Sequence, residues 1–531
     1  MAESGASMGA NRTEPDGPAV PADLLGRRVS CDGERASVLY VGPVPPTEGL
    51  WLGVEWDNPQ RGKHDGAHGG VQYFTCRHPG GGSFVRPAKV GLGVDFLTAV
   101  GQVYQIDAEE VTSNDISFGP KKLKWGKITE RGYESLPSAL LGSCEVNGPG
   151  ADGEIRKTTP NVQVLDLSAS LLSRWEDVSA IAQQLEHLES LTLMKNRLRL
   201  PADVSAHRRA FCGLRVLALN GCELTWPQIL QCAPMWPQLE ELSVQDNDIT
   251  ELQRPEGALL QSLRSLNVSG NRLVQHTVLA LAALPRLEYL NLSKTGLSDI
   301  RFDDAAPGGQ TEMFPALTKL NLEHNNISEW RVVDELAKLP RLTHFLCHFN
   351  QLASSDGNPK TANQLLIAKL GGLVFLNNCE IHPKERRGAE IDYIKMFGEE
   401  WLKAGGGGRP SAHFVSQHPR YLSLVTKYGA PEEGELKKPE PFALKNQLLK
   451  ITFVFPDAAD REPIEKKLLA SMLVQKVKGL LYRLLKVPAA DLRLTYTSPK
   501  KLGTEFEIDG DLKTLQFYSI EDGDQVLVRW S

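Results

Sequence analysis

The sequence has few of the features that mark secreted, membrane-spanning or disulfide-stabilised chains. Its 531 residues include only eight cysteines, which are scattered and form no CxxC pair. Scattered cysteines are typical of a reducing compartment and argue against a disulfide framework or a zinc site. The most apolar run near the middle, VLALAAL, is too short to span a bilayer, and the first twenty residues lack the apolar core of a signal peptide. We therefore expect a cytoplasmic protein with no membrane partner.

Two further absences concern chemistry. The chain has 59 Lys and Arg against 65 Asp and Glu, a net charge of -6, and so lacks the basic excess of a general nucleic-acid binder. It also lacks a Walker motif, GxSxG, HExxH and any Cys/His grouping that suggests catalysis. We expect no enzyme activity, no cofactor, no metal site and no nucleic-acid partner.

Composition divides the chain into six segments. Residues 1–20 are polar with Gly and Pro and are expected to be disordered. Residues 21–96 have short apolar runs between turn signals, which predicts a small all-β domain. Residues 97–155 are assigned to a connector, 156–428 to a repeat array with a C-terminal cap, 429–447 to a charged linker, and 448–531 to a last domain.

The array repeats the pattern LxxLxLxxN. Eight copies begin at Val162, Leu188, Leu214, Leu239, Leu263, Leu287, Leu317 and Leu342, at intervals of 26, 26, 25, 24, 24, 30 and 25 residues. The pattern resembles leucine-rich repeats, which predicts an α/β solenoid with a concave strand face. The Asn of each copy is expected to hydrogen-bond backbone between coils: these are Asn196, Asn247, Asn271, Asn325 and Asn350, with Cys222 and Thr295 in two coils. A helix over 384–408, ending in glycines, is expected to cap the array.

The last domain begins with an alternating strand, LLKITFVF. Residues 465–487 follow with a 3.6-residue apolar period, and then LRLTYTS, TEFEID and QVLVRW read as strands. This order resembles the ubiquitin-like β-grasp fold. The terminal Gly-Gly used for conjugation is absent, so we expect a docking module for partner cofactors or the proteasome, or a terminal fold without a partner.

The stretch RGKHDGAHGG, residues 61–70, fixes a lysine within a glycine loop. A phosphate-binding P-loop would need Gly where Asp57 stands and Ser or Thr where His64 stands. The stretch from Gly49 to Pro87 instead resembles the CAP-Gly domain of cytoskeleton-associated proteins, a small β-barrel. Members of that family bind acidic tails such as that of α-tubulin, which end in Glu-Glu-Tyr or Glu-Glu-Phe.

The resemblance implies a peptide site in this domain. The residues carried over are Trp51, Lys63, His64, Asp65, Phe84 and Arg86, with Gly62 and Gly66 as the loop glycines. Residues 61–89 hold five Lys and Arg against one acid, a local net charge of +4 that would attract an acidic peptide. Tyr73 and Phe74 are expected in the core, and a core role is the alternative for Trp51 and Phe84. His64 replaces the Asn usual in the family, which predicts an altered affinity and pH dependence.

The order of the three domains resembles that of the tubulin-folding chaperones. The resemblance implies a cytoplasmic, cytoskeleton-associated chaperone that captures α-tubulin and, with cofactors C and D, joins it to β-tubulin. With cofactor B, such proteins also dissociate the heterodimer. The alternative is a CAP-Gly microtubule-associated scaffold or adaptor, although the heptads that such linkers use for dimerisation are not visible in the sequence.

Overall fold

The computed structural model describes residue 21 and residues 23–104, 132–407, 409–431, 448–458, 460–497 and 505–530. The expected disordered segment 1–20, the middle of the connector (105–131) and most of the linker (432–447) lie outside these residues. The chain divides into two compact units, of which the second comprises residues 354–361 and 438–531. Within the described ranges, no helix has the length and apolarity needed to cross a membrane.

The N-terminal domain is built on a four-stranded antiparallel sheet, which confirms the predicted all-β class. Its strands, in sheet order, are β1 (Arg28–Cys31), β2 (Glu34–Val44), β3 (Thr47–Trp56) and β6 (Gly82–Val85). A short hairpin of β4 (Ala67–His68) and β5 (Val71–Gln72) lies between β3 and β6 in the chain. Side chains alternate across a strand, so Leu52, Val54 and Trp56 enter the core while Trp51 and Gly53 lie on the opposite face.

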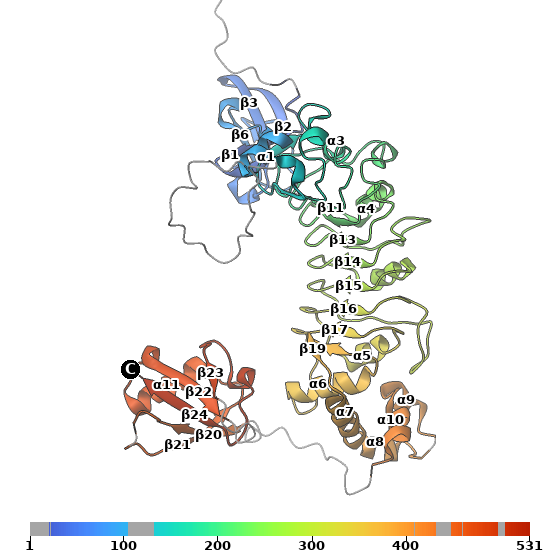
Figure 1. The fold of residues 1–531 in the computed structure, drawn as a ribbon, viewed down its shortest axis with the longest axis vertical. Coiled ribbons are helices and arrows are strands. Elements are labelled where there is room, and N and C mark those ends of the chain that lie inside the picture. The colour runs from blue at the N-terminus through green and yellow to red at the C-terminus, as the bar shows by residue number, and fades with distance from the viewer. Residues whose placement is uncertain are drawn as a thin grey trace, which may run out of the picture. The chain divides into compact units, whose positions relative to one another are not determined.

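The repeats form one eleven-stranded sheet, which confirms the predicted solenoid (Figure 1). All neighbours pair in parallel except the last two strands, and the central residue of each repeat strand is buried. The strands are β8 (Ser138–Leu140), β10 (Val164–Asp166), β11 (Ser190–Thr192), β12 (Val216–Ala218), β13 (Glu241–Ser243), β14 (Ser265–Asn267), β15 (Tyr289–Asn291), β16 (Lys319–Asn321), β17 (His344–Leu346), β18 (Phe375–Leu376) and β19 (Cys379–Glu380).

The opposite side of the coils is covered by short helices and irregular turns. The α-helices there are α3 (Trp175–Ala182), α4 (Trp226–Cys232) and α5 (Trp330–Leu336), and residues Gln275–Ala283 form a 3₁₀ helix. Trp175 packs against Trp236 with ring centroids 5.7 Å apart, and both indoles are buried. The coils therefore share one continuous core rather than separate ones.

The expected asparagine ladder is present. The Asn271 amide donates to the carbonyls of Val244 (3.0 Å) and Val268 (2.8 Å), and its oxygen accepts from the backbone of Asn247 at 3.0 Å. In one of the two coils where another residue replaces the Asn, the Thr295 hydroxyl donates to the Leu292 carbonyl at 2.7 Å. These bonds satisfy backbone groups that stacking of the coils buries.

The connector predicted over 97–155 differs from the structure in both of its described parts. Helix α1 (Phe96–Tyr104) buries Phe96, Ala99 and Val100 in the core of the array. Strand β7 (Val94–Asp95) pairs with β9 (Val146–Gly148), which lies just before α2 (Glu154–Thr158), and β8 is the edge strand of the solenoid sheet. This region carries no repeat signature because it covers the apolar end of the array instead of continuing it.

The C-terminal cap is helical, but the single helix expected over 384–408 is broken. Its helices are α6 (Pro359–Lys369), α7 (Pro383–Met396), α8 (Gly398–Lys403), α9 (Ala412–Gln417) and α10 (Tyr421–Tyr428). Phe397, whose backbone is not helical, separates α7 from α8. The break brings Trp401 of α8 beside Tyr421 of α10, in a separate apolar cluster with Tyr393 of α7.

The second unit has the β-grasp order that the sequence indicates. Its sheet contains β20 (Leu448–Val454), β21 (Ile464–Leu469), β22 (Leu492–Thr497), β23 (Phe506–Ile508) and β24 (Gln525–Trp530), in the order β21-β20-β24-β22-β23, with helix α11 (Val474–Leu485). The helical period predicted from residue 465 is wrong at its start, because residues 464–469 pair with β20 as a strand. At the C-terminal end of α11, the apolar period predicts that Leu484 is buried. In the structure Leu484 is exposed and the next residue, Leu485, is buried instead.

Candidate functional site

The glycine loop is fixed to strand β6 by backbone hydrogen bonds. The Lys63 N–H donates to the Gly82 carbonyl at 2.7 Å, and the Gly82 N–H donates to the His64 carbonyl at 2.8 Å. A Cβ atom at Gly62 would lie 2.0 Å from the Gly80 carbonyl oxygen, and one at Gly66, where φ is +94°, would lie 2.0 Å from that of Phe74. Only glycine permits these approaches, so the two predicted loop glycines bring the loop against the sheet.

Lys63 is exposed at this point, and its backbone is held while its side chain is free. Among the described residues, none pairs with its ammonium group. Arg86 and Lys89 likewise have no acidic partner in the described part of the chain. These three cations remain available to an acidic ligand.

His64 is held as a neutral ring. Its Nδ1 accepts a hydrogen bond from the Gly66 N–H at 2.9 Å, which leaves Nε2 as the protonated nitrogen. Burial, and then the neighbouring charges of His68 and Lys63, lower the pKa of His64 from its usual value, while Asp65 opposes the shift. The ring also packs on Phe84, with centroids 5.0 Å apart.

Asp65 supports the loops around the site. Its carboxylate accepts a hydrogen bond from the Gly80 N–H, and its carbonyl accepts one from the Gln72 amide at 2.8 Å. The carboxylate thus joins the glycine loop to the loop before β6. The structure assigns Asp65 this positioning contact within the domain, which the sequence did not indicate.

The aromatic side chains form a wall beside the loop. Phe84 lies at the centre of a ring cluster, 5.5 Å from both Tyr73 and Phe74 and 6.4 Å from Tyr40. Phe74 is buried, whereas Tyr73 and Phe84 are only half-buried. The expectation that Tyr73 and Phe74 lie in the core is therefore confirmed for Phe74, whereas Tyr73 is only half-buried.

Trp51 and Arg86 extend this wall on the same face of the sheet. Gly53 pairs with Phe84 across the strands, so Trp51 and Arg86, each two residues away, point to the same side. The Arg86 guanidinium stacks on the Trp51 ring at 3.9 Å and donates to the Leu50 carbonyl at 3.2 Å. The structure thus joins Trp51 to Arg86, and His64 to Phe84, along one surface.

Two of the five local cations are committed elsewhere. Arg61 pairs with Asp32 at 3.1 Å and stacks on Trp56 at 4.1 Å. Arg77 pairs with Glu223 of the array at 2.7 Å and also with Asp248. The local charge offered to a ligand is therefore smaller than the count along the sequence indicates.

The cysteine and the histidines of this region do not form a metal site in the structure. Burial raises the pKa of the Cys76 thiol to about 11, so Cys76 is a packed, protonated thiol. In the described part of the chain, no group of three or more His, Cys, Asp or Glu side chains is placed to hold a metal ion.

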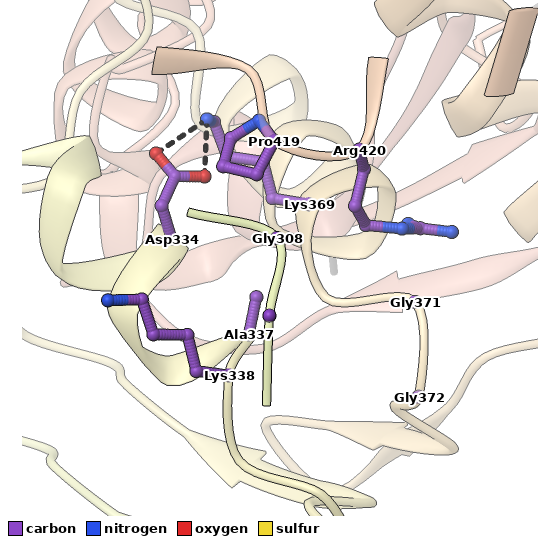
Figure 2. A pocket seen from close by; sticks show the side chains of 10 residues that line it. Gly308, Asp334, Ala337, Lys338, Lys369, Gly371, Gly372, Pro419 and Arg420 are labelled. Carbon is purple, nitrogen blue, oxygen red and sulfur yellow. Dashed lines mark hydrogen bonds and ion pairs between the residues drawn. The ribbon is translucent and has the colours of Figure 1, made fainter. Parts of the chain in front are cut away.

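A hollow lies where the last coils meet the cap (Figure 2). Its cations already have internal acceptors: Lys369 donates to both oxygens of Asp334 (2.8 and 3.0 Å), Lys338 donates to the Ala305 carbonyl at 2.8 Å, and Arg420 donates to Glu390 at 3.0 Å. The Lys369–Asp334 pair joins the cap to the array, the other two bonds lie within the array and within the cap, and all three cations are thus already engaged inside the protein.

Comparisons with known proteins show which families the chain resembles. The family model for the CAP-Gly domain matches residues 25–90. Tubulin-specific chaperone E of Danio rerio is 55% identical over 518 residues, covering 96% of this chain and 99% of that protein. The protein of the same name from Homo sapiens is 47% identical over 523 residues, again covering 96% of this chain and 99% of the relative.

The C-terminal domain also has a counterpart among solved structures. The ubiquitin-like domain of mouse tubulin-specific chaperone E is 54% identical over 16% of this chain and 88% of that one, with a TM-score of 0.16. The two full-length relatives cover all three domains and most of the linking sequence. The chain therefore belongs to the tubulin-specific chaperone E family.

Proposed function

We propose that this chain is a tubulin-folding chaperone whose CAP-Gly domain captures the acidic C-terminal tail of α-tubulin. One observation carries the proposal: Lys63, which has no acidic partner among the described residues, directly precedes His64, whose ring packs on the half-exposed Phe84. A cation next to an apolar surface suits a peptide that ends in carboxylates and an aromatic ring. Its relatives are named tubulin-specific chaperones, which supports tubulin as the protein that supplies such a tail.

Each predicted residue has a role in this proposal. Lys63 and Arg86 meet carboxylates, Trp51 and Phe84 contact the terminal ring, and the Nε2–H of His64 donates a hydrogen bond. Asp65, Gly62 and Gly66 hold the loop in place. Recognition and positioning thus both come from Trp51 and the 61–86 region.

The repeat array supplies the second contact, to the globular body of α-tubulin. Joining two modest contacts in one chain raises the overall affinity through effective concentration. In this way the chain promotes assembly of the α/β heterodimer with cofactors C and D, and with cofactor B its dissociation. The ubiquitin-like domain is a docking module for these cofactors or the proteasome. We place the protein in the cytoplasm, associated with the cytoskeleton, and acting without catalysis.

The test is binding to purified α-tubulin with and without its C-terminal tail. The wild-type chain is compared with Lys63→Ala and with Lys476→Ala, a control at an exposed lysine of the ubiquitin-like domain that has no acidic partner among the described residues. We expect tail removal and Lys63→Ala each to weaken binding, with no further loss when the two are combined, and Lys476→Ala to bind as wild type. Full affinity after both changes would show that the tail is not held by this loop.

A further inference from the structure

The loop that forms one side of the CAP-Gly site is tied to the repeat array. Arg77 and His78 lie on the segment between β5 and β6, and both reach Glu223, which follows β12. The Arg77 guanidinium contacts the Glu223 carboxylate at 2.7 Å and donates to its carbonyl at 3.2 Å. The His78 Nε2 lies 3.5 Å from the other carboxylate oxygen.

The contact extends into a network of alternating charges. Arg197 of the array pairs with Glu223 and lies 3.4 Å from Asp57 of the CAP-Gly domain, and Asp57 in turn pairs with Arg28. Asp248 pairs with Arg77 as a second acidic partner. The CAP-Gly domain contributes two cations and one acid, and the array one cation and two acids, so the two surfaces are complementary.

Glu223 is the centre of this network. Its side chain is 21% exposed and that of Arg197 is 16% exposed, whereas Arg77 is half exposed. Partial burial weakens solvent screening, so a carboxylate shared by two guanidinium groups constrains both more strongly than an isolated surface pair would.

The same segment holds the peptide site together. The His78 N–H donates to Glu55 at 2.9 Å, and the Gly80 N–H donates to Asp65 of the glycine loop. The segment continues into Gly82, whose carbonyl holds Lys63. These hydrogen bonds connect the segment that carries Arg77 to the backbone of Lys63 and His64. Holding Arg77 in place therefore also constrains that backbone.

We propose that Glu223, in the repeat array, is a positioning residue for the peptide site of the CAP-Gly domain. By holding Arg77 and His78 it keeps the loop before β6 in the form that supports Lys63. The proposal rests on the function proposed above, because it assigns a residue to that same site.

The experiment uses the full chain and two readouts. The first is the dissociation constant of a synthetic acidic peptide ending in Glu-Glu-Tyr. The second is amide hydrogen exchange of the segment 75–82 without peptide. The variants are Glu223→Gln, Arg77→Gln and their combination, with Lys63→Ala to report on the site itself. The matched control is Glu288→Gln, which breaks an ion pair with Arg264 within the array.

We expect Glu223→Gln to weaken peptide binding by about three- to tenfold, with Arg77→Gln adding little in the double variant. Exchange in 75–82 should become faster by a similar factor, and Glu288→Gln should leave both readouts unchanged. A Glu223→Gln chain that binds and exchanges like wild type, while Lys63→Ala loses binding, would overturn this inference but not the proposed function. If the wild-type chain does not bind the peptide, the proposed function fails, and the exchange readout alone decides whether Glu223 positions the loop.

Discussion

His64 Nδ1 accepts the backbone N–H of Gly66 at 2.9 Å. A side-chain acceptor bonded to the N–H two residues on is the arrangement that an Asn at this position would make, so the imidazole here forms a turn of the kind that an amide side chain forms. The bond also requires an unprotonated Nδ1, which connects the shape of the loop to the charge of the ring.

The first prediction concerns pH. Because burial lowers the pKa of His64 in the folded chain, protonation of the ring is displaced to lower pH, and a peptide of acidic residues should bind with similar affinity at pH 7.5 and 6.5. The unfolded chain has the higher histidine pKa and takes up the proton first as pH falls. His64 therefore contributes stability above pH 6.5 that is lost as the pH falls through the lower folded pKa.

The measurement is ring nitrogen NMR of His64 as a function of pH, with peptide affinity in parallel. His64→Asn is the control, since it keeps the acceptor without a titrating ring. A change in affinity between pH 7.5 and 6.5 that His64→Asn abolishes would contradict the prediction.

The second prediction concerns Gly66. The Gly66→Ala variant would adopt a strained backbone and place its Cβ against the Phe74 carbonyl, so the domain should lose at least about 2 kcal/mol of stability. Gly70→Ala is the control, because Gly70 also has a positive φ (+79°) but has open space around it. Hydrogen exchange of the β3 amides measures both, and equal effects would show that the close approach to Phe74 does not matter.

The third prediction concerns Arg86. Arg86→Lys keeps the charge but loses the planar group that stacks on Trp51 and reaches the Leu50 carbonyl. We expect binding of an acidic peptide to weaken by about threefold or more, with little change in the unfolding temperature. The conservative change Lys89→Arg, at a site with no such stack, should bind as wild type. If Arg86→Lys also bound as wild type, charge alone would account for the role of this residue.

The fourth prediction concerns the asparagine ladder. Asn271→Ala removes an amide that serves two coils and leaves buried backbone groups without partners, which should cost about 2–4 kcal/mol. Asn326→Ala is the control, because Asn326 is exposed and makes one long bond of 3.4 Å to the Gly296 carbonyl. Urea unfolding of both variants gives the comparison. A loss at Asn271 no greater than at Asn326 would mean that water replaces the ladder at no cost.

The repeats, the glycine loop and the order of the β-grasp strands could be predicted from the sequence because each is a local pattern. A leucine spacing or a glycine before a lysine is dictated by strand geometry and backbone sterics within a few residues. The predicted start of the helix at residue 465 is wrong for a related reason. The apolar residues of the segment 464–469 fit either a helical or a strand period, and only pairing with β20 makes this segment a strand.

Which charged side chains pair within the protein, and which remain free to bind a ligand, was decided by the tertiary structure. Arg77 counts toward a basic patch along the sequence, yet it pairs with Glu223, 146 residues away. The described parts of the connector likewise belong to the array because their apolar residues meet an open core. The sequence by itself therefore determined the repeats, the loop and the residue types of the site. Which cations remain free to bind, and what holds their loop, depends on contacts between distant segments that only folding brings together.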